Sequence, residues 1–178
     1  MRILTAGDLT LEPQVVAHAD AMYAVLSDPA LYAYEDAPPA SREWLRTRFA
    51  KLESRRSGDG CELWLNWVIR MANGELIGYV QATVRPDGSA AIAYVLGSAY
   101  WGRGLARRAT SAMIDELVAR YRVDQLVAVA SRRNLRSIRL LKRLGFAPAP
   151  PALQLEGGVP AEDVLMIRAS RPDVRPSV

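Results

Sequence analysis

The chain has 178 residues, half of them hydrophobic and 24% charged, a balance that excludes intrinsic disorder, collagen and coiled coil as descriptions of the whole. A single cysteine and a single histidine exclude a disulfide framework and a multi-thiolate metal site, so we expect no metal. No run reaches the roughly 18 apolar residues of a membrane span, and no apolar signal segment begins the chain. We therefore expect a cytoplasmic protein without a membrane partner.

The first half of the sequence predicts two helices and then a meander of strands. We expect a short strand at residues 9–12 and a helix over residues 15–26, where apolar residues recur at helical spacing. A second helix is expected over residues 41–56, with Ser41 as its N-cap and Gly58 after its end. Alternating polarity and turn residues then predict three antiparallel strands, at residues 63–69, 76–84 and 90–96.

The second half changes to a helical period. Apolar residues repeat every four positions over residues 105–121, which predicts an amphipathic helix. A short apolar run at residues 125–130 predicts a buried strand. A further helix is expected over residues 134–144, with Asn134 in the position of its N-cap and Gly145 as its C′ residue.

The C-terminal region predicts one more hairpin. Its strands are expected at residues 153–156 and 163–168, separated by Gly157-Gly158. The order of elements predicts a mixed α+β fold. We expect a single domain over residues 1–169 and a flexible tail over residues 170–178.

Positive charge is concentrated in one part of the chain. The net charge is +4, but residues 100–145 hold eleven Lys or Arg against three Asp or Glu, a balance of +8. Such clustering indicates a polyanionic partner. Nearly all of the positive charge is arginine, whose planar fork suits phosphate oxygens.

A glycine-rich stretch, Tyr100-Trp101-Gly102-Arg103-Gly104-Leu105-Ala106-Arg107, lies between a predicted strand and a predicted helix. Glycines let the backbone approach a ligand, and the first amides of a helix are unpaired donors that bind phosphate. Arg107 stands where a dinucleotide-binding fingerprint needs its third glycine, and a Walker loop's Gly-Lys-Ser/Thr is absent. A glycine-rich turn without a ligand is the alternative.

Two further motifs accompany this stretch: Asn134-Leu135-Arg136-Ser137 and, ten residues after its start, Leu144-Gly145-Phe146. Together with Trp101-Gly102-Arg103-Gly104-Leu105-Ala106 they resemble the Gcn5-related N-acetyltransferases (GNAT), and in particular their RimJ/RimL branch. The resemblance covers nearly the whole chain. It implies a GNAT fold of the α+β class, with a central, mostly antiparallel sheet that contains a splayed strand pair and is flanked by helices.

The resemblance implies acetyl-CoA as the cosubstrate, lying where strands 90–96 and 125–130 splay apart. Its pantetheine arm is expected to pair with backbone at Val95 and Leu96, and its diphosphate to rest on the amides of the glycine-rich loop. The residues assigned to the cofactor in this way are Val95, Leu96, Trp101, Gly102, Arg103, Gly104, Leu105, Ala106, Arg107, Asn134 and Ser137. The candidates for the 3′-phosphate are Arg132, Arg133 and Arg136.

The resemblance also assigns catalytic roles. The Leu96 amide is expected to polarise the acetyl carbonyl, because the developing oxyanion needs a donor. Many relatives protonate the departing thiolate with a tyrosine at the position of Leu141, and we assign this role to Ser137, one turn earlier. Ala90 and Ala91 stand where the branch often carries a glutamate base. The remaining base candidates are Glu35, Glu156 and Asp163.

We therefore expect an N-acetyltransferase that moves the acetyl group of acetyl-CoA to a primary amine, on a protein N-terminus or a small molecule, by direct attack in a ternary complex. Residues 1–99 hold nine basic and twelve acidic side chains, which favours a cationic acceptor. We expect five residues on the predicted strands either to line the acceptor pocket or to pack in the core. They are Trp64, Asn66, Trp67, Gln81 and Tyr94.

Two alternatives and one open question accompany this expectation. A non-catalytic acyl-CoA sensor on the same fold is the first alternative, because the tyrosine and the strand glutamate of relatives are missing. A nucleic-acid-binding module would explain the basic pI of about 9.5, but no nucleic-acid motif supports it, and we expect no nucleic-acid partner. The family often forms homodimers, and the sequence leaves a homodimer open.

Overall fold

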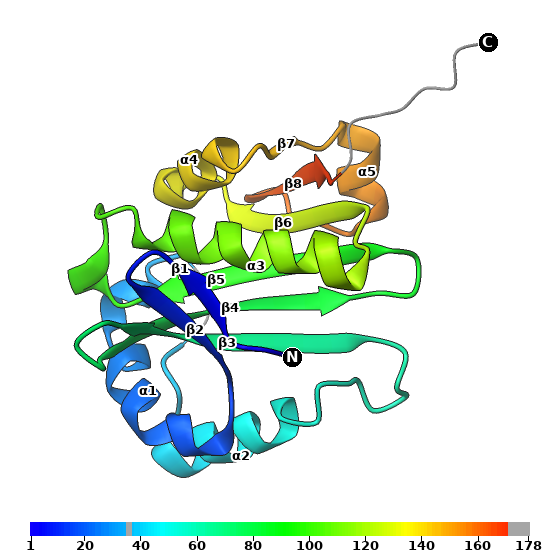
Figure 1. Ribbon diagram of the computed structural model, residues 1–178. Coiled ribbons are helices and arrows are strands. Elements are labelled where there is room, and N and C mark those ends of the chain that lie inside the picture. Colours follow the sequence, from blue (N-terminus) through cyan, green and yellow to red (C-terminus); the bar gives the residue numbers. More distant parts are fainter. Residues whose placement is uncertain (35–36, 171–178) are drawn as a thin grey trace.

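The computed structural model describes residues 1–34 and 37–170, and in them the strands form one mixed sheet with helices on both faces (Figure 1). The order of the eight strands in the described residues is β1-β2-β3-β4-β5-β6-β8-β7, and every neighbouring pair is antiparallel except β5 and β6. Their bounds are β1 Leu4–Ala6, β2 Leu9–Pro13, β3 Leu63–Met71, β4 Leu76–Val84, β5 Ser89–Leu96, β6 Gln125–Ser131, β7 Ala147–Pro148 and β8 Asp163–Ala169. The predicted mixed α+β class and mostly antiparallel sheet are confirmed.

The helices cover the two faces of the sheet unequally. The α-helices are α1 Ala19–Leu26, α2 Arg42–Leu52, α3 Leu105–Tyr121, α4 Leu135–Arg143 and α5 Pro151–Glu156, and the short 3-10 helices are η1 Val16–His18, η2 Pro29–Tyr32 and η3 Ser98–Tyr100. In Figure 1, α1 and α2 lie together on one side of β3–β5, and α3 runs along the other side. Met22 and Phe49 pack against Val68 on the first face, and Met113 belongs to the larger core on the second.

The predicted helices are confirmed with changed boundaries. Ser41 is the N-cap of α2, and its Oγ accepts the Trp44 N–H at 3.0 Å. The helix ends at Leu52 rather than at residue 56, because Arg55 takes a φ of +62°, a left-handed conformation that an α-helix cannot contain. The expected helix over residues 15–26 is divided into η1 and α1.

The main irregularity of the sheet is the separation of β5 from β6. The pairs that hold these parallel strands together are Ser89↔Gln125, Ala90↔Leu126 and Ala91↔Val127. Beyond Ala91, β5 stays paired with β4 as far as Leu96, and β6 stays paired with β8 as far as Ser131. The two strands therefore part from each other while each keeps its other neighbour, and the predicted splayed pair is confirmed.

Gly78 on β4 permits a close approach to the end of β5. Its φ is +156°, and a Cβ placed there would lie 2.1 Å from the carbonyl oxygen of Val95 and 2.8 Å from the Cα of Leu96. The next residue of the chain after β5, Gly97, donates its N–H to the Ile77 carbonyl at 2.9 Å. The backbone of β4 thus fixes the position of the last residues of β5, which border the strand gap.

The predicted C-terminal hairpin is wrong. Residues 151–156 form the helix α5, with Pro151 at its first position, where the missing N–H costs nothing. β8 pairs with β6 along its whole length, and β7 takes the positions of Met166 and Ile167 on its other edge. The Ser170 N–H donates to the Asp124 carbonyl at 2.9 Å, which ties down the first residue of the expected tail. Residues 171–178 lie outside the described residues.

Two kinds of feature are absent from the described residues, a membrane-spanning helix and a metal-binding cluster. None of their helices combines the length and the apolar composition that a bilayer span requires. Among the same residues, no cluster of three or more His, Cys, Asp or Glu side chains is placed to hold a metal ion.

Candidate active site

A cavity of about 380 Å³ opens where β5 and β6 separate, and we call it the strand-gap cavity. Residues 92–96 of β5 form one wall, and Ala128 and Val129 of β6 form the other. The loop before α3, the helix α4 and the turn η2 complete it. The sequence-predicted cofactor residues that line it are Val95, Leu96, Trp101, Gly102, Gly104, Leu105, Ala106, Arg107, Asn134 and Ser137. Arg103 does not line it and instead places its guanidinium carbon 5.8 Å from the centre of the Tyr100 ring.

Two glycines shape the loop that leads into α3. Gly102 and Gly104 have φ values of +75° and +74°, and a Cβ on either residue would meet no heavy atom within 4 Å. The glycines therefore serve the left-handed backbone and leave open space beside it. Gly104 is the N-cap of α3, and the described residues provide no side-chain hydrogen bond to cap this helix end. The first amides of α3 are thus donors without a capping side chain, at the positive end of the helix dipole.

Trp101 connects this loop to the end of β5. Its Nε1–H donates to the Leu96 carbonyl at 2.8 Å. The guanidinium carbon of Arg136, on α4, lies 3.7 Å from the centre of the Trp101 ring, a cation–π contact. Trp101 therefore lies between the two sides of the strand gap and contacts Leu96 on one side and Arg136 on the other. Neither contact was expected from the sequence, where Trp101 was assigned only to the loop.

Asp28 joins two walls of the cavity. Its Oδ2 accepts the Ser98 N–H at 3.1 Å, just after β5, and its Oδ1 accepts the Ala30 N–H at 2.9 Å, at the start of η2. Hydrogen bonds from Ser98 first, and then from the Ala30 amide, hold the pKa of Asp28 below its usual range. The ionised carboxylate therefore fixes η2, which contributes Ala30 and Leu31 to the cavity, against the end of β5.

Tyr94 and Ser137 meet inside the cavity. The Tyr94 Oη lies 2.8 Å from the Ser137 Oγ, and it also donates to the Ser137 carbonyl at 3.2 Å. Ser137 is held from the other direction, because its N–H donates to the Asn134 Oδ1 at 3.1 Å, which makes Asn134 the N-cap of α4. This cap uses the amide oxygen of Asn134 and leaves its NH₂ group available to the cavity. The predicted N-cap of this helix is confirmed.

The cationic lining of the cavity comes from one face of α4 and the start of α3. Arg136, Arg139 and Arg143 line it at the spacing i, i+3, i+7, and Arg107 lines it from α3. Arg132, a candidate for the 3′-phosphate, instead binds the Ala161 carbonyl at 2.9 Å and Gln154 at 3.2 Å. Arg139 and Arg143 were not among the residues expected at the cofactor, and the signal for them in the sequence is their spacing, which puts them on the helix face of Arg136.

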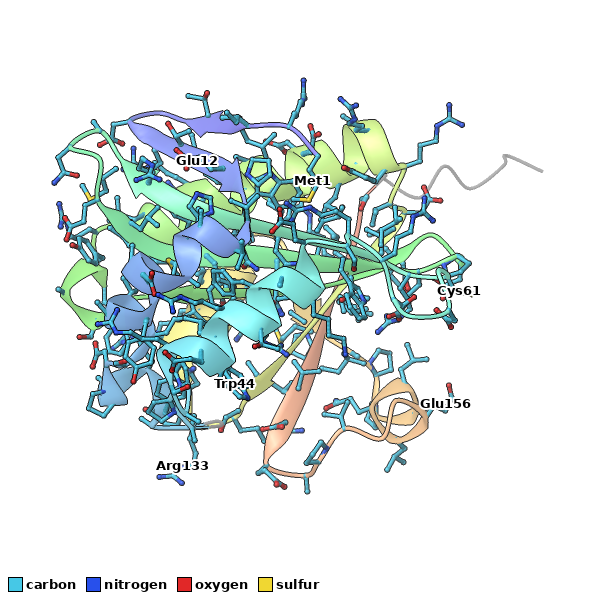
Figure 2. All side chains as sticks on the ribbon, turned by 90° about the horizontal axis from the view of Figure 1, so that it is seen from below. Met1, Glu12, Trp44, Cys61, Arg133 and Glu156 are labelled. Atoms are coloured by element: carbon cyan, nitrogen blue, oxygen red, sulfur yellow. The ribbon has the colours of Figure 1, made fainter. Side chains whose placement is uncertain are left out.

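Arg133 is not among the residues that line the cavity. The carboxylate candidates are absent from its lining too, and the part of the chain that the structure describes contributes no Asp or Glu to it. Glu35 lies outside the described residues. Glu156 is exposed at the end of α5, and Figure 2 shows it well away from Arg133. Asp163 begins β8, where it is paired with Ser131.

The five residues proposed for the acceptor pocket or the core divide three ways. Trp67 is fully buried, and its Nε1–H donates to the Arg2 carbonyl at 2.9 Å, so it belongs to the core. Tyr94 lines the strand-gap cavity beside Ser137. The remaining three residues line a separate hollow beneath α2; they are Trp64, Asn66 and Gln81.

With this geometry in place, comparison with known proteins gives the class of the chain. A model of the acetyltransferase (GNAT) domain family matches residues 8–147, and the chain belongs to this family. One curated relative, described as the uncharacterized N-acetyltransferase p20 of Bacillus licheniformis, is 26% identical over 148 residues, which cover 82% of this chain and 83% of the relative. The predicted GNAT family is confirmed.

Solved structures share the same fold. RimL, a ribosomal L7/L12 α-N-protein acetyltransferase solved in complex with coenzyme A, superimposes with a TM-score of 0.80 at 18% identity, covering 94% of this chain and 97% of RimL. A ribosomal-protein-S5-alanine acetyltransferase from Vibrio fischeri superimposes with a TM-score of 0.77 at 21% identity, covering 98% and 99% of the two chains. The GNAT architecture expected from the motifs is therefore the observed one.

Proposed function

We propose that this protein transfers the acetyl group of acetyl-CoA to a primary amine, by direct attack of the amine in a ternary complex. The observation that carries the proposal is the strand gap with an uncapped, glycine-rich helix start among its walls. CoA carries several negative charges, and its proposed path crosses the residues whose charge balance is +8. The CoA complex of RimL, which has the same fold, supports the same cofactor here.

The cofactor would occupy the cavity along its length. Its diphosphate would accept hydrogen bonds from the amides of residues 102–107, and Arg107 and Arg139 would add charge beside it. The pantetheine arm would continue between the parted strands beside Leu96. Val95, the other residue expected to pair with it, turns its carbonyl toward Gly78 of β4 instead. The free NH₂ of Asn134 would donate to one of the amide carbonyls of the arm. Each of these contacts uses a polar group that faces the cavity.

The Leu96 N–H is the proposed donor to the acetyl carbonyl. Successive residues of a strand direct their backbone N–H groups to opposite edges. The Gly97 N–H points toward β4, where it donates to Ile77, and the Leu96 carbonyl accepts from Trp101 rather than from β4. The Leu96 N–H is therefore directed toward the strand gap, where it would stabilise the oxyanion of the tetrahedral intermediate.

The transfer step would then proceed without a covalent enzyme intermediate. The lone pair of the neutral amine attacks the thioester carbonyl carbon, a C–N bond forms, and the C–S bond breaks as the intermediate collapses. The departing CoA thiolate takes a proton from the Ser137 hydroxyl, which Tyr94 can replace through its own hydroxyl at 2.8 Å. The proton lost by the attacking nitrogen passes to a base or to solvent.

The base candidates that the sequence offered are Glu35, Glu156 and Asp163. The described lining of the cavity contains arginines and no carboxylate, so proton transfer to water is the simplest route that this lining supports. If Glu35 is instead the base, Glu35→Gln should remove the acidic limb of the pH profile of kcat/KM. If water takes the proton, the variant should follow the wild-type profile.

Thiol release tests the proposed function. The purified protein is mixed with acetyl-CoA and a panel of amines that includes peptides with free N-termini, since both ribosomal-protein acetyltransferases named above act on such proteins. We expect amine-dependent release of free CoA thiol and a product whose mass is increased by one acetyl group. Tight CoA binding without thiol release for any amine would favour the non-catalytic sensor.

A further inference from the structure

A second hollow, of about 310 Å³, lies between α2 and the sheet face that this helix covers, and we call it the α2 pocket. Its principal lining residues are Arg48, Lys51, Trp64, Asn66, Gln81 and Thr83. The first two belong to α2, and the other four belong to β3 and β4. The family motifs do not include any of these residues, and Trp64, Asn66 and Gln81 are among those that the sequence suggested for an acceptor pocket or the core.

Asn66 gives the first sign that the pocket takes a ligand. The residue is only 4% exposed, it lines the pocket, and its side-chain amide forms no hydrogen bond with any residue that the structure describes. Its polar atoms are not among the fully buried, unpaired side-chain atoms of the described residues, so the amide reaches the open space of the pocket and is available to a ligand. Gln81 and Thr83, its neighbours in the lining, also keep their side-chain polar groups unpaired in the described part of the chain. Three polar side chains therefore converge on one unoccupied space.

The charges around the pocket select the kind of ligand. Arg48 and Lys51 are one helical turn apart, and each lies near an indole ring, Arg48 at 5.9 Å from Trp44 and Lys51 at 5.8 Å from Trp64. No carboxylate of the described residues forms an ion pair with either cation, and the described lining contains no acid. Glu62, beside Trp64, is occupied by Arg85 at 3.7 Å. Two unpaired cations above three unpaired neutral side chains form a site for an anion.

The pocket lies one strand away from the strand gap. Gln81 of β4 is paired with Ala93 of β5, and Ala93 lines the strand-gap cavity. Side chains of paired residues lie on the same face of a sheet with their Cβ atoms about 5 Å apart. Leu96, the proposed donor to the thioester carbonyl, is paired with Gly78, three residues along β4 from Gln81. A group held beside Gln81 is therefore about 10 Å along the sheet and one strand spacing across it from the amine, roughly 11 Å in all.

We propose that the α2 pocket binds an anionic group, a carboxylate or a phosphate, carried by the acceptor roughly 11 Å from its reactive amine. This inference rests on the proposed function and narrows its substrate class to amines that also bear an anion. It reverses the cationic acceptor that the overall charge of residues 1–99 favoured. Four of the twelve acids of that region are engaged elsewhere: Asp8 with Arg108, Glu12 with Arg70, Asp20 with Arg46 and Asp28 with backbone amides.

Matched acceptors of one length test the proposal. The series is 8-aminooctanoate, 1-octylamine and 1,8-diaminooctane, with 6-aminohexyl phosphate to separate phosphate from carboxylate, and the readout is kcat/KM from thiol release. We expect the anionic acceptors to have a KM roughly tenfold or more below that of the other two, the size of one charge-assisted hydrogen bond. Equal KM values across the series, or the lowest KM for the diamine, would overturn it.

Variants locate the effect in the pocket. Arg48→Gln combined with Lys51→Gln should raise the KM of the anionic acceptors to that of octylamine, and leave the rate with octylamine unchanged. Asn66→Leu, which removes the amide at similar volume, should give a smaller loss of the same kind. The control is Arg120→Gln, an exposed charge at the end of α3, which should change nothing. A loss shared equally by all acceptors would contradict the proposal.

A binding experiment separates this proposal from the proposed function. Trp64 lines the pocket, so its fluorescence should change on saturation with 8-aminooctanoate or inorganic phosphate in the absence of acetyl-CoA. The change should disappear in the Arg48→Gln/Lys51→Gln variant. If no amine releases thiol but this saturation is observed, the acetyl-transfer function fails while the anion site stands. If thiol is released but neither anion binds nor lowers KM, the anion site fails alone.

Discussion

The Tyr94 hydroxyl lies 2.8 Å from the Ser137 hydroxyl, within a cavity formed by the separation of β5 from β6. One residue comes from the strand on one side of the gap and the other from the helix that follows the opposite strand. Relatives carry a tyrosine at the position of Leu141, and here a tyrosine hydroxyl reaches the same helix from β5 instead. The pair supplies a linked donor and acceptor at the place where the resemblance puts the cofactor sulfur.

Removing either hydroxyl should slow turnover more than it weakens cofactor binding. Ser137→Ala takes away the proposed direct donor to the thiolate, and Tyr94→Phe takes away the group that reprotonates it. General acid catalysis contributes about 10²- to 10⁴-fold, so we expect losses of kcat in that range for Ser137→Ala and smaller losses for Tyr94→Phe. Stopped-flow thiol release measures kcat, and calorimetry measures the Kd of CoA.

The double variant shows whether the two hydroxyls act together. If they form one relay, Ser137→Ala with Tyr94→Phe should be no slower than Ser137→Ala alone. Losses that multiply would instead assign the two residues separate roles. Unchanged kcat in both single variants would remove Ser137 from the mechanism.

Gly104→Glu should abolish CoA binding, because it places a carboxylate beside the amides proposed for the diphosphate. We expect the Kd to rise by roughly 100-fold or more. Gly104→Ala is the matched control. A Cβ there meets no heavy atom within 4 Å, so its cost is the left-handed backbone, about 1–2 kcal/mol of stability. Equal affinities of the two variants would mean that the diphosphate lies elsewhere.

Gly78→Ala should destabilise the protein much more than Gly74→Ala. Both glycines have positive φ, but a Cβ at Gly74 meets nothing within 4 Å, whereas a Cβ at Gly78 would lie 2.1 Å from the Val95 carbonyl oxygen. Gly74→Ala should cost about 1–2 kcal/mol, which lowers Tm by roughly 2–8 °C. We expect Gly78→Ala to lower Tm by more than Gly74→Ala does. It should also weaken CoA binding, because the added Cβ forces Val95 to move. Thermal melts of the two variants with the same Tm would refute the close approach.

Asp28 should make stability depend on pH in the acid range. Its folded pKa lies below the ordinary value of 3.8, owing to hydrogen bonds from Ser98 and Ala30. Its contribution is therefore fully present above the unfolded pKa and is lost as pH falls through the lower folded pKa. The Tm difference between wild type and Asp28→Asn should be constant from about pH 8 to pH 5 and shrink below about pH 4. A constant difference down to pH 2.5 would show that the charge of Asp28 does not matter.

Local patterns predicted most of the fold. Alternation and turn residues predicted the meander β3–β5, and the run of glycines between a strand and a helix predicted the left-handed loop at Gly102 and Gly104. The N-caps at Ser41 and Asn134 followed from residue type and position. These features depend on neighbours within a few residues, which is why a sequence reveals them.

The failures all involve contacts between distant segments. The hairpin expected at residues 153–156 looked plausible locally, but these residues form α5, and the strand partners of β8 are β6 and the two-residue β7. Tyr94 alternates on its strand like a core residue, and only the placement of α4 brings it to Ser137. The acceptor stays a matter of prediction: the anionic group proposed here differs from the cationic acceptor that overall charge favours, because a sum over residues 1–99 does not show which acids are already paired.

The most direct test of the account is calorimetry of the wild-type protein with CoA and with pantetheine, which shares the thiol arm but lacks the diphosphate and the nucleotide. The account predicts clear heat of binding with CoA and a Kd for pantetheine weaker by roughly 100-fold or more, because the amides of residues 102–107 then have no anion to bind. No heat with CoA, or equal affinity for the two ligands, would contradict it.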